Sequence, residues 1–498
     1  MSRYTVTTAI PYVNGRPHVG HALELVETDV LARHRRQLGD EVRFQTGTDD
    51  NALKNVQGAE AEGISPAEYV ERVAQRFLAL REALDLSFDD FIKTSSDPRH
   101  KPGVDKFWTA CAERGDFYRK SYTGLYCVGC ELFYQPDELA DGRCREHATV
   151  PEMVEENNWF FRLSAYQQQL RDLIASDTLR IEPVSRKNEV LSFIESGLED
   201  FSASRSMTRA RGWGIPVPGE PDQVIYVWFD ALINYITGPG YGTDEASLRY
   251  WWDDADERVH VIGKGIIRFH AIYWPAMLLS AGIPLPDTIF VHEYLTAGGQ
   301  KISKSAGTAE DPTDIAATYG TDALRWWMLR DVARAGDTDY TAERLAARAN
   351  EDLANNIGNL VNRTVSMIHR YRQGVIPYPV PDNPAADDLR AARSEAAPTI
   401  DRALTEFDFR RATEAVTRVG DEGNRYVEAV RPWELAKPER NDHADGSALD
   451  AALAELVTTC RDLATQLQPF LPLLAGRIAE QCGNDGPTVA NPSPVFPR

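Results

Sequence analysis

The chain has 498 residues, 43% of them hydrophobic, and a formal net charge of −21 at pH 7. This length predicts about three or four domains with real cores. Taken globally, the acidic charge argues against a nucleic-acid partner, although a large acidic protein can still carry one basic face. The longest apolar run, residues 271–286, is broken by three prolines and is too short for the roughly 20 apolar residues of a transmembrane helix. No signal peptide is visible in "MSRYTVTTAIPY", so we expect a cytoplasmic protein without a membrane partner.

Strand and helix patterns alternate at the start of the chain. Residues 3–9 and 41–47 are predicted as buried strands, and each is followed by helical sequence, the first helix covering about residues 18–39. These lengths are typical of a parallel α/β sheet. Residues 116–222 break the pattern and are interpreted as an insertion, after which the α/β pattern resumes. From about residue 342 the sequence is mostly helical and rich in alanine.

The turn after the first strand carries two histidines around a glycine. His18, Gly20 and His21 stand in "VNGRPHVGH", where the first helix begins. A helix N-terminus presents unpaired N–H groups and partial positive charge, and ligands of such sheets bind at the carboxyl ends of the strands. The stretch therefore predicts a turn that binds phosphate. The alternative is structural, with His18 capping the helix and His21 a buried polar residue.

A second basic loop lies far downstream. Lys301 and Lys304 alternate with serines in "GGQKISKSAGT". Mobile lysines there could neutralise the charge that develops on a leaving pyrophosphate. On these residues alone, a solvated basic loop is the alternative.

The cysteines suggest one metal site. Cys127-x-x-Cys130 is followed, after thirteen residues, by Cys144-x-x-His147. Two ligand pairs at this spacing are typical of tetrahedral zinc, and because all four positions are filled by side chains the zinc is predicted to be structural. The alternative is a chance cluster of reduced thiols in a reducing compartment.

The two basic loops together resemble the class I aminoacyl-tRNA synthetases, since "PHVGH" is similar to their HIGH motif and "KISKS" to their KMSKS motif. Other segments resemble one family of that class, the methionyl-tRNA synthetases, in the right order: "TGTD", "WGIPVPG", "YVWFDALINYI", "FHAIYWPAMLL" and "NRYVEAVRPWELAK". The resemblance covers nearly the whole chain. It implies a methionine–tRNA ligase that forms methionyl-adenylate from ATP and L-methionine and transfers the methionyl group to methionine tRNA.

The same resemblance implies a fold. We expect an α/β class with a Rossmann-like parallel sheet in residues 1–115 and 223–290, split by a connective insertion with a zinc knuckle in 116–222. A stem-contact segment with the KISKS loop is expected in 291–348, and an α-helical anticodon-binding domain in 349–498. Because no segment after about residue 485 is long enough for a dimerisation domain, we expect a monomer.

The resemblance also implies roles for single residues. Those expected to bind ATP, which magnesium accompanies, are His18, Gly20, His21, Gly263, Lys301 and Lys304, and the histidines and lysines among them are expected to be catalytic. Those expected to bind methionine are Ile10, Tyr12, Asp49, Trp228, Ala231, Leu232, Tyr235, Ile266 and His270. Asp49 is expected to hold the ammonium group, and the aromatic walls suit a thioether. Without the resemblance, Trp228, Leu232 and Ile266 would be interpreted as ordinary core.

Three residues of the helical part match the family's anticodon-reading positions: Asn359, Arg363 and Trp433. The first two lie one helical turn apart, and single-stranded bases are recognised by stacking and by hydrogen bonds to their edges. The alternative is an exposed Asn/Arg pair and a tryptophan in the bundle core. Nearby arginines, expected to provide local positive charge, are Arg344, Arg348, Arg370 and Arg372.

Five places depart from the usual family pattern. Asp50-Asn51-Ala52 stands where Glu-His-Gly is typical, and Gly265 replaces an aspartate expected to contact the ATP ribose. Glu293 and Thr308 replace a glycine and an asparagine, and residues 204–214 form a longer segment than expected. One lost hydrogen bond costs about 0.5–1.5 kcal/mol. We therefore expect an active enzyme with altered ATP binding or inhibitor sensitivity, for example a second copy tolerant of a methionine-mimicking antibiotic.

Two alternatives stay open. The protein could be a paralogue that activates a methionine analogue, which the intact anticodon residues argue against. It could also be a catalytically weak tRNA-binding or regulatory protein. Lys301 and Lys304 argue against that second alternative, whereas Gly265 and Asn51 mildly favour it.

Overall fold

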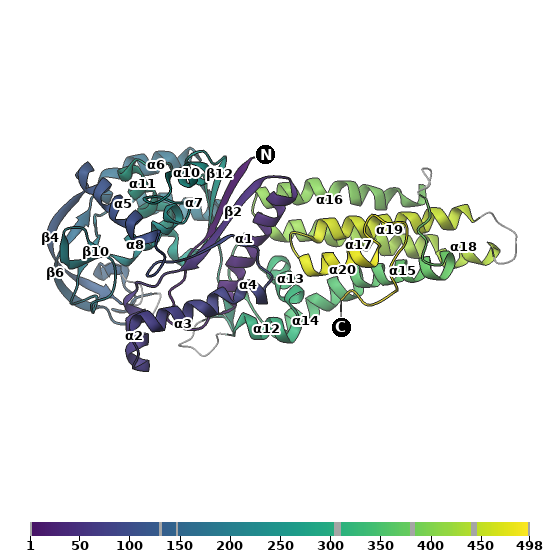
Figure 1. The fold of residues 1–498 in the computed structure, drawn as a ribbon, viewed down its shortest axis with the longest axis horizontal. Coiled ribbons are helices and arrows are strands. Elements are labelled where there is room, and N and C mark those ends of the chain that lie inside the picture. Colours follow the sequence, from purple (N-terminus) through teal and green to yellow (C-terminus); the bar gives the residue numbers. More distant parts are fainter. Residues whose placement is uncertain are drawn as a thin grey trace. The chain divides into compact units, whose positions relative to one another are not determined.

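The computed structural model describes residues 2–128, 132–145, 148–302, 310–378, 384–439 and 446–496. The chain forms two compact units, shown in Figure 1. Unit 1 comprises residues 1–28, 38–81 and 87–292, and unit 2 comprises residues 29–37, 82–86 and 293–498. Helix α1 (Val19–Gln37) gives its first half to unit 1 and its second half to unit 2. Among the described residues, no helix is long and apolar enough to cross a membrane.

Unit 1 is built on a sheet of six strands that are all parallel, in the order β3-β2-β1-β12-β13-β7. Their bounds are β1 (Arg3–Thr8), β2 (Glu41–Thr48), β3 (Asp90–Lys93), β7 (Arg180–Glu182), β12 (Glu257–Gly263) and β13 (Thr288–His292). The strand order reverses between β1 and β12. In open parallel sheets, the carboxyl ends at such a switch point form the ligand-binding crevice. The sequence-based prediction of a parallel α/β sheet is confirmed.

The helices of unit 1 are α2 (Leu53–Glu62), α3 (Pro66–Leu78), α5 (His100–Arg114), α6 (Gln167–Ala175), α7 (Val184–Glu195), α8 (Val227–Leu232), α9 (Asn234–Thr237), α10 (Glu245–Leu248) and α11 (Trp274–Ala281). The short helix α4 (Leu80–Ala83) has two residues in each unit. The helical sequence expected up to residue 85 is divided into three helices. Gly63 ends α2 at a φ of 70°, a left-handed conformation that glycine adopts without strain, and the side chain of Ser65 caps α3 by accepting from Glu68 N.

Residues 116–222, the expected insertion, are mainly antiparallel. One sheet has the order β5-β4-β6-β8 and a second β10-β11-β9. The strands are β4 (Phe117–Cys127), β5 (Leu132–Tyr134), β6 (Glu152–Phe161), β8 (Phe201–Ser202), β9 (Ser204–Ser206), β10 (Pro216–Val217) and β11 (Glu220–Ile225). The same range also contains β7, which pairs with β13 in the main sheet. The range therefore mixes inserted structure with one strand of the core.

Unit 2 is mostly helical, as the alanine-rich sequence predicts. Its helices are α12 (Pro312–Tyr319), α13 (Thr321–Asp331), α14 (Ala342–Arg348), α15 (Asn359–Arg372), α16 (Asp387–Thr405), α17 (Phe409–Val430), α18 (Pro432–Glu439), α19 (Ser447–Leu467) and α20 (Pro472–Gln481), and its strands are β14 (Leu295–Ala297), β15 (Gln300–Lys301) and β16 (Thr338–Asp339). Helices α16, α17 and α19 run side by side (Figure 1). The fully buried Arg325 donates to Asp29 Oδ2 at 2.8 Å and to Phe470 O at 2.8 Å, so the end of α1 is anchored within this unit.

Candidate active site

The two histidines form a compact stack at the start of α1. His18 N donates to His21 Nδ1 at 3.1 Å, and Gly20 N donates to His18 Nδ1 at 3.1 Å. The ring centroids are 3.8 Å apart. Because each Nδ1 accepts a hydrogen bond, each neutral ring carries its proton on Nε2. The turn therefore combines side-chain N–H donors with the backbone donors of a helix N-terminus.

The capping and ligand-binding interpretations of this turn are compatible. His18 does cap the helix through its bond from Gly20 N, yet both rings are half-buried, so His21 is not the fully buried residue of the structural alternative. Gly20 packs closely on the turn, since a Cβ there would lie 3.0 Å from His18 Cε1 and would require that ring to shift. The expected contact of both histidines with phosphate stays a prediction.

The residues expected to bind methionine come from four places in unit 1 and several of them are in contact. Tyr12 and Asp49, after β1 and β2, form a parallel bridge. The Tyr12 and Trp228 rings lie 6.0 Å apart, and those of Trp228 and His270 6.4 Å apart, both edge to face. Tyr235 OH lies 2.7 Å from His270 Nε2.

The remaining members surround this group. Ala231 and Leu232 are 3% and 2% exposed on α8, and Ile266 accepts from His270 Nδ1 through its carbonyl at 3.0 Å. Ile10 is half-buried next to β1. The sequence alone would have assigned most of these side chains to the core.

Phe269 is a wall residue that the sequence analysis missed. Its ring stacks on Trp228 with centroids 3.7 Å apart and an interplanar angle of 4°. Trp228 Nε1 is buried and has no hydrogen-bond partner among the described residues. The stack therefore fixes the plane of the indole, and the only signal in the sequence is that Phe269 precedes His270.

The wall of this pocket is electrically neutral. Burial lowers the pKa of His270 to about 4, so its imidazole is uncharged at neutral pH. Burial raises the pKa of Tyr235 well above its usual value, so its hydroxyl stays protonated and donates to His270. Asp49, 1% exposed, is the carboxylate beside this wall, and its Oδ1 accepts from Asn51 N at 3.3 Å. A neutral aromatic wall with one carboxylate suits a ligand with an apolar body and an ammonium group.

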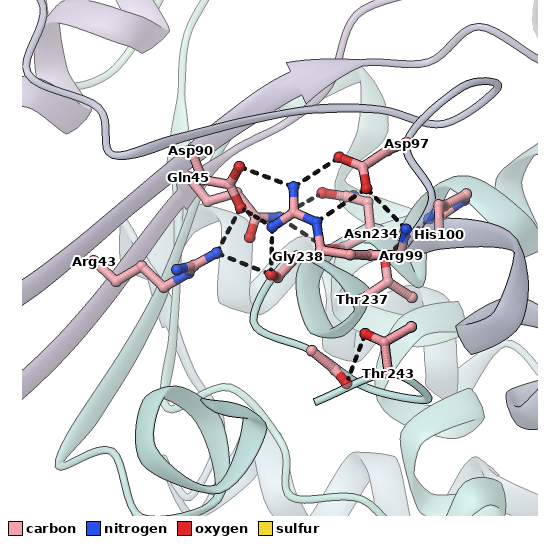
Figure 2. Close-up of polar contacts among 11 residues, drawn as sticks. Arg43, Gln45, Asp90, Asp97, Arg99, His100, Asn234, Thr237, Gly238 and Thr243 are labelled. Carbon is pink, nitrogen blue, oxygen red and sulfur yellow. Dashed lines mark hydrogen bonds and ion pairs between the residues drawn. The ribbon is translucent and has the colours of Figure 1, made fainter. Parts of the chain in front are cut away.

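Polar groups hold α9 and the residue that follows it (Figure 2). Gln45 Nε2 donates to Asn234 O at 2.9 Å and to Asn234 Oδ1 at 3.0 Å. The carbonyl of Gly238, just after α9, accepts from Arg43 at 3.0 Å and from Arg99 at 2.8 Å. A Cβ on Gly238 would lie 2.0 Å from the Gln45 side-chain oxygen, so only glycine fits. The sequence alone predicts no role for these residues, because their contacts depend on tertiary packing.

The expected nucleotide-binding residues are only partly described. Gly263 ends β12 opposite His292 of β13. Lys301 ends β15, where it pairs with Thr296 in unit 2, whereas Lys304 and Thr308 lie outside the described residues. Asp339 Oδ1 accepts from Gly299 N and from Thr296 Oγ1, both at 2.9 Å, and so orders the start of the lysine loop.

The departures from the family pattern occupy defined positions. Gly265 is exposed in a single 3₁₀ turn after β12. His292 Nε2 lies 3.0 Å from Glu24 Oε2, so a carboxylate–imidazole pair stands at the end of β13. The longer segment 204–214 brings Trp213, whose Nε1 donates to Asp50 O at 2.8 Å.

The structure describes two of the four expected zinc ligands. Cys127 and Cys144 are each 1% exposed, with Cys127 Sγ 3.5 Å from Thr149 Oγ1 and Cys144 Sγ 3.7 Å from Tyr134 OH. Cys130 and His147 lie outside the described residues. Within the residues that are described, no three or more His, Cys, Asp or Glu side chains are grouped to hold a metal. The zinc site stays a prediction.

The anticodon positions lie on α15 and α18 in unit 2. Arg363 donates to Glu428 Oε1 at 2.8 Å, and its guanidinium lies 5.7 Å from the centre of the Trp433 ring. Asn359 Nδ2 donates to Asn424 Oδ1 at 3.5 Å. Trp433 is half-buried, so it is not a bundle-core residue.

The arginines around the anticodon positions are largely engaged with protein groups. Arg348 pairs with Asp331 at 2.8 Å and Arg372 with Asp450 at 2.5 Å, and Arg344 donates to Asp339 O at 2.8 Å. Their charge is partly neutralised within unit 2. The expected local positive surface is therefore weaker than the sequence suggests.

Comparisons with known proteins identify the family. A family model described as "tRNA synthetases class I (M)" matches residues 4–144 and 129–365. The methionine–tRNA ligases of Brucella suis biovar 1 and Mycobacterium bovis are each 39% identical to the chain, with 100% of this chain and 98% of each relative covered. The structure of Mycobacterium tuberculosis methionyl-tRNA synthetase in complex with methionyl-adenylate is similar with a TM-score of 0.93 and 38% identity, covering 100% of both chains.

The parallel sheet, the histidine turn and the family model together define a class I aminoacyl-tRNA synthetase. Within that class, the chain belongs to the methionyl-tRNA synthetase family, as its resemblance in sequence implies.

Proposed function

We propose that the protein is a methionine–tRNA ligase. In the first step a carboxylate oxygen of L-methionine attacks the α-phosphorus of ATP, and the bond to pyrophosphate breaks to give methionyl-adenylate. In the second step the terminal ribose hydroxyl of methionine tRNA attacks the methionyl carbonyl, and AMP leaves. One observation carries the proposal: a neutral aromatic pocket with the carboxylate of Asp49 beside it, in a chain that aligns end to end with a relative solved with methionyl-adenylate.

The pocket residues divide methionine between them. The Asp49 carboxylate binds the ammonium group as a charge-assisted hydrogen-bond acceptor. The thioether packs against Trp228, Tyr235 and His270, because sulfur is favoured against aromatic rings. Tyr12 closes the pocket above Trp228, and the apolar contacts come from Ile10, Ala231, Leu232 and Ile266.

The nucleotide is held mainly through its phosphates. His18 and His21 donate from Nε2, and Gly20 and Gly263 let the backbone approach the ligand closely. Lys301 and Lys304 neutralise the negative charge that grows on the leaving pyrophosphate. Magnesium accompanies ATP and supplies further charge neutralisation there.

Zinc and tRNA complete the proposal. The two buried thiols Cys127 and Cys144 fit a tetrahedral site together with Cys130 and His147, and zinc there would cross-link the insertion without taking part in the chemistry. Asn359, Arg363 and Trp433 read the anticodon by edge hydrogen bonds and stacking. The domain boundaries given above, a monomeric state and a cytoplasmic location belong to the same proposal.

The experiment is exchange of labelled pyrophosphate into ATP by purified protein without tRNA, for methionine and for the other amino acids separately. We expect exchange with methionine alone, and charging of methionine tRNA when tRNA is added. Exchange without charging would favour an analogue-activating paralogue. No exchange with any amino acid, from folded and zinc-loaded protein, would contradict the proposal and favour the tRNA-binding alternative.

A further inference from the structure

A short polar chain runs from the back of Asp49 into the helix that lines the pocket. Asn51 N donates to Asp49 Oδ1 at 3.3 Å, while the Asn51 side chain donates through Nδ2 to Asp230 Oδ2 at 3.2 Å. Asp230 lies on α8, directly before the pocket residue Ala231. One asparagine therefore contacts both the carboxylate and the pocket helix.

The chain continues to a buried histidine on α5. Asp230 Oδ1 lies 3.8 Å from His100 Nε2, and neither atom has a hydrogen-bond partner among the described residues. The other side of the imidazole is fixed, since His100 Nδ1 lies 2.9 Å from Thr237 Oγ1 at the end of α9, as Figure 2 shows. Asp230, His100 and Thr237 are all 0% exposed.

A second amide supports the same turn. Asn55 Nδ2 donates to Asp49 O at 3.0 Å and to Asp50 O at 2.9 Å. The backbone of residues 49–51 is thus fixed independently of the Asn51 side chain. The bond from Asn51 Nδ2 to Asp230 is therefore not needed to fix this backbone. It connects the turn to α8 and sets the distance between them.

We infer that Asn51 and Asp230 are positioning residues for methionine: they hold the Asp49 carboxylate at a fixed distance from the aromatic wall on α8 and α9, with His100 as the buried support of Asp230. The inference rests on the proposed function, because Asp49 is the proposed ligand of the ammonium group. A buried carboxylate without its donor is costly, so loss of the amide would let α8 and the turn move apart.

The surroundings of Asp230 explain why an amide side chain suits position 51. Burial raises the pKa of Asp230, and a neutral donor satisfies its oxygen without adding a charge to the pocket. Asparagine stands at position 51 where histidine is typical of the family, and both side chains can donate to a carboxylate. An aspartate of the same shape could not donate and would set two carboxylates against each other.

The test uses Asn51→Asp as the isosteric disruption and Asn51→His as the conservative rescue, in the full-length protein. Pyrophosphate exchange gives KM for methionine, KM for ATP and kcat. We expect Asn51→Asp to raise KM for methionine about tenfold or more, with KM for ATP and kcat within about twofold, and Asn51→His to restore most of the affinity. Asn157→Asp, on the exposed side of β6, is the matched control and should change nothing.

A second readout separates positioning from general damage. The inhibition constant of the des-amino analogue 4-(methylthio)butanoate reports the pocket without the ammonium contact. Asn51→Asp should leave this constant unchanged while methionine weakens, and the thermal midpoint should show that the variant is folded. Equal weakening of both ligands, or no effect on either, would overturn the inference. If Asp49→Asn also leaves the preference for methionine over the analogue intact, the proposed role of Asp49 fails, and the positioning role fails with it.

Discussion

The proposed methionine pocket of unit 1 and the proposed anticodon positions of unit 2 are built in opposite ways. In the pocket, Tyr235 and His270 are each 1% exposed and each is bonded to a neighbour before any ligand arrives. At the anticodon positions, Arg363 and Trp433 are only half-buried, and Arg363 pairs with Glu428, whose side chain is 65% exposed. A small neutral side chain is selected by a preorganised cavity, whereas a charged nucleic acid can compete for exposed groups that are held loosely.

The comparison implies large effects in the pocket and graded effects at the anticodon positions. The pocket has little capacity to relax, because Tyr235, His270 and the Asp49 carboxylate are each bonded to another buried group. On the proposed function, the anticodon positions would exchange one partner for another when RNA binds, so the effect of each variant would depend on the protein contact that it already makes.

The largest effect is expected for Asp49→Asn. The variant removes the charge that binds ammonium, and we expect KM for methionine in pyrophosphate exchange to rise roughly 100-fold, corresponding to a loss of about 3 kcal/mol. KM for ATP should change little. A matched control is Asp50→Asn, which alters the adjacent carboxyl. A rise of less than about threefold in Asp49→Asn would place the ammonium contact elsewhere.

Glu27 tests whether burial alone controls the protonation of a carboxyl group in unit 1. Burial raises the pKa of Glu27 from 4.5 to about 7, against the opposing effect of His292, and its Oε2 has no hydrogen-bond partner among the described residues. Between pH 4.5 and about 7, the Glu27 carboxyl therefore stays protonated in the folded state, whereas the unfolded state has already released this proton. This contribution to stability is fully present below pH 4.5 and is lost as the pH rises through about 7, a change of roughly 3 kcal/mol.

Glu27→Gln should remove this pH dependence. Thermal midpoints measured between pH 5 and pH 8 are expected to fall less in the variant than in the wild type. Glu68→Gln, on the exposed side of α3, provides the control and should follow the wild type. Parallel curves for wild type and Glu27→Gln would show that the carboxyl is ionised throughout, with its charge compensated by His292.

Tyr235→Phe tests how much the hydrogen bond between Tyr235 and His270 contributes to the pocket. The change removes the donor to the buried His270 Nε2 without altering the shape of the wall. An unsatisfied buried acceptor costs about 1–3 kcal/mol, so we expect KM for methionine to rise about five- to tenfold and kcat to change less. Tyr241→Phe, at a buried tyrosine of the same unit outside the pocket, should have no such effect on KM. Equal changes in both variants would remove the special role of this hydroxyl.

The smallest effect is expected at position 265. Gly265→Asp restores the carboxylate that the family pattern places near the ATP ribose, and Gly265 is exposed, so the side chain can be accommodated. We expect KM for ATP to fall about two- to fivefold while KM for methionine stays constant. Gly476→Asp, at an exposed glycine of α20, is a control for an added charge at another glycine. If Gly265→Asp has no effect, the ribose is held by other groups, and the Glu24–His292 pair at the end of β13 is the first to examine.

Local sequence patterns predict much of the fold, whereas the roles of several site residues depend on tertiary packing. Strand β1, the start of α1 and the histidine turn follow from hydrophobic pattern, turn residues and glycine, all readable within a few residues. Phe269, Asp230 and His100 carry no local signal, because their partners lie far along the chain. Phe269 stacks on Trp228, and Asp230 contacts Asn51 and His100, both more than a hundred residues away. Strand β7 lies within the range expected for the insertion, because its three residues give no usable strand pattern. For the aromatic walls, only the family resemblance provides a signal.

The proposed function requires that unit 1 activate methionine and that Trp433 of unit 2 act only through tRNA. Two rates in Trp433→Ala separate these roles: methionine-dependent pyrophosphate exchange without tRNA, and charging of methionine tRNA. We expect an exchange rate equal to the wild type and a charging efficiency reduced about tenfold or more, because base stacking contributes about 1–3 kcal/mol. Loss of exchange, or charging at the wild-type rate, would contradict the proposed function.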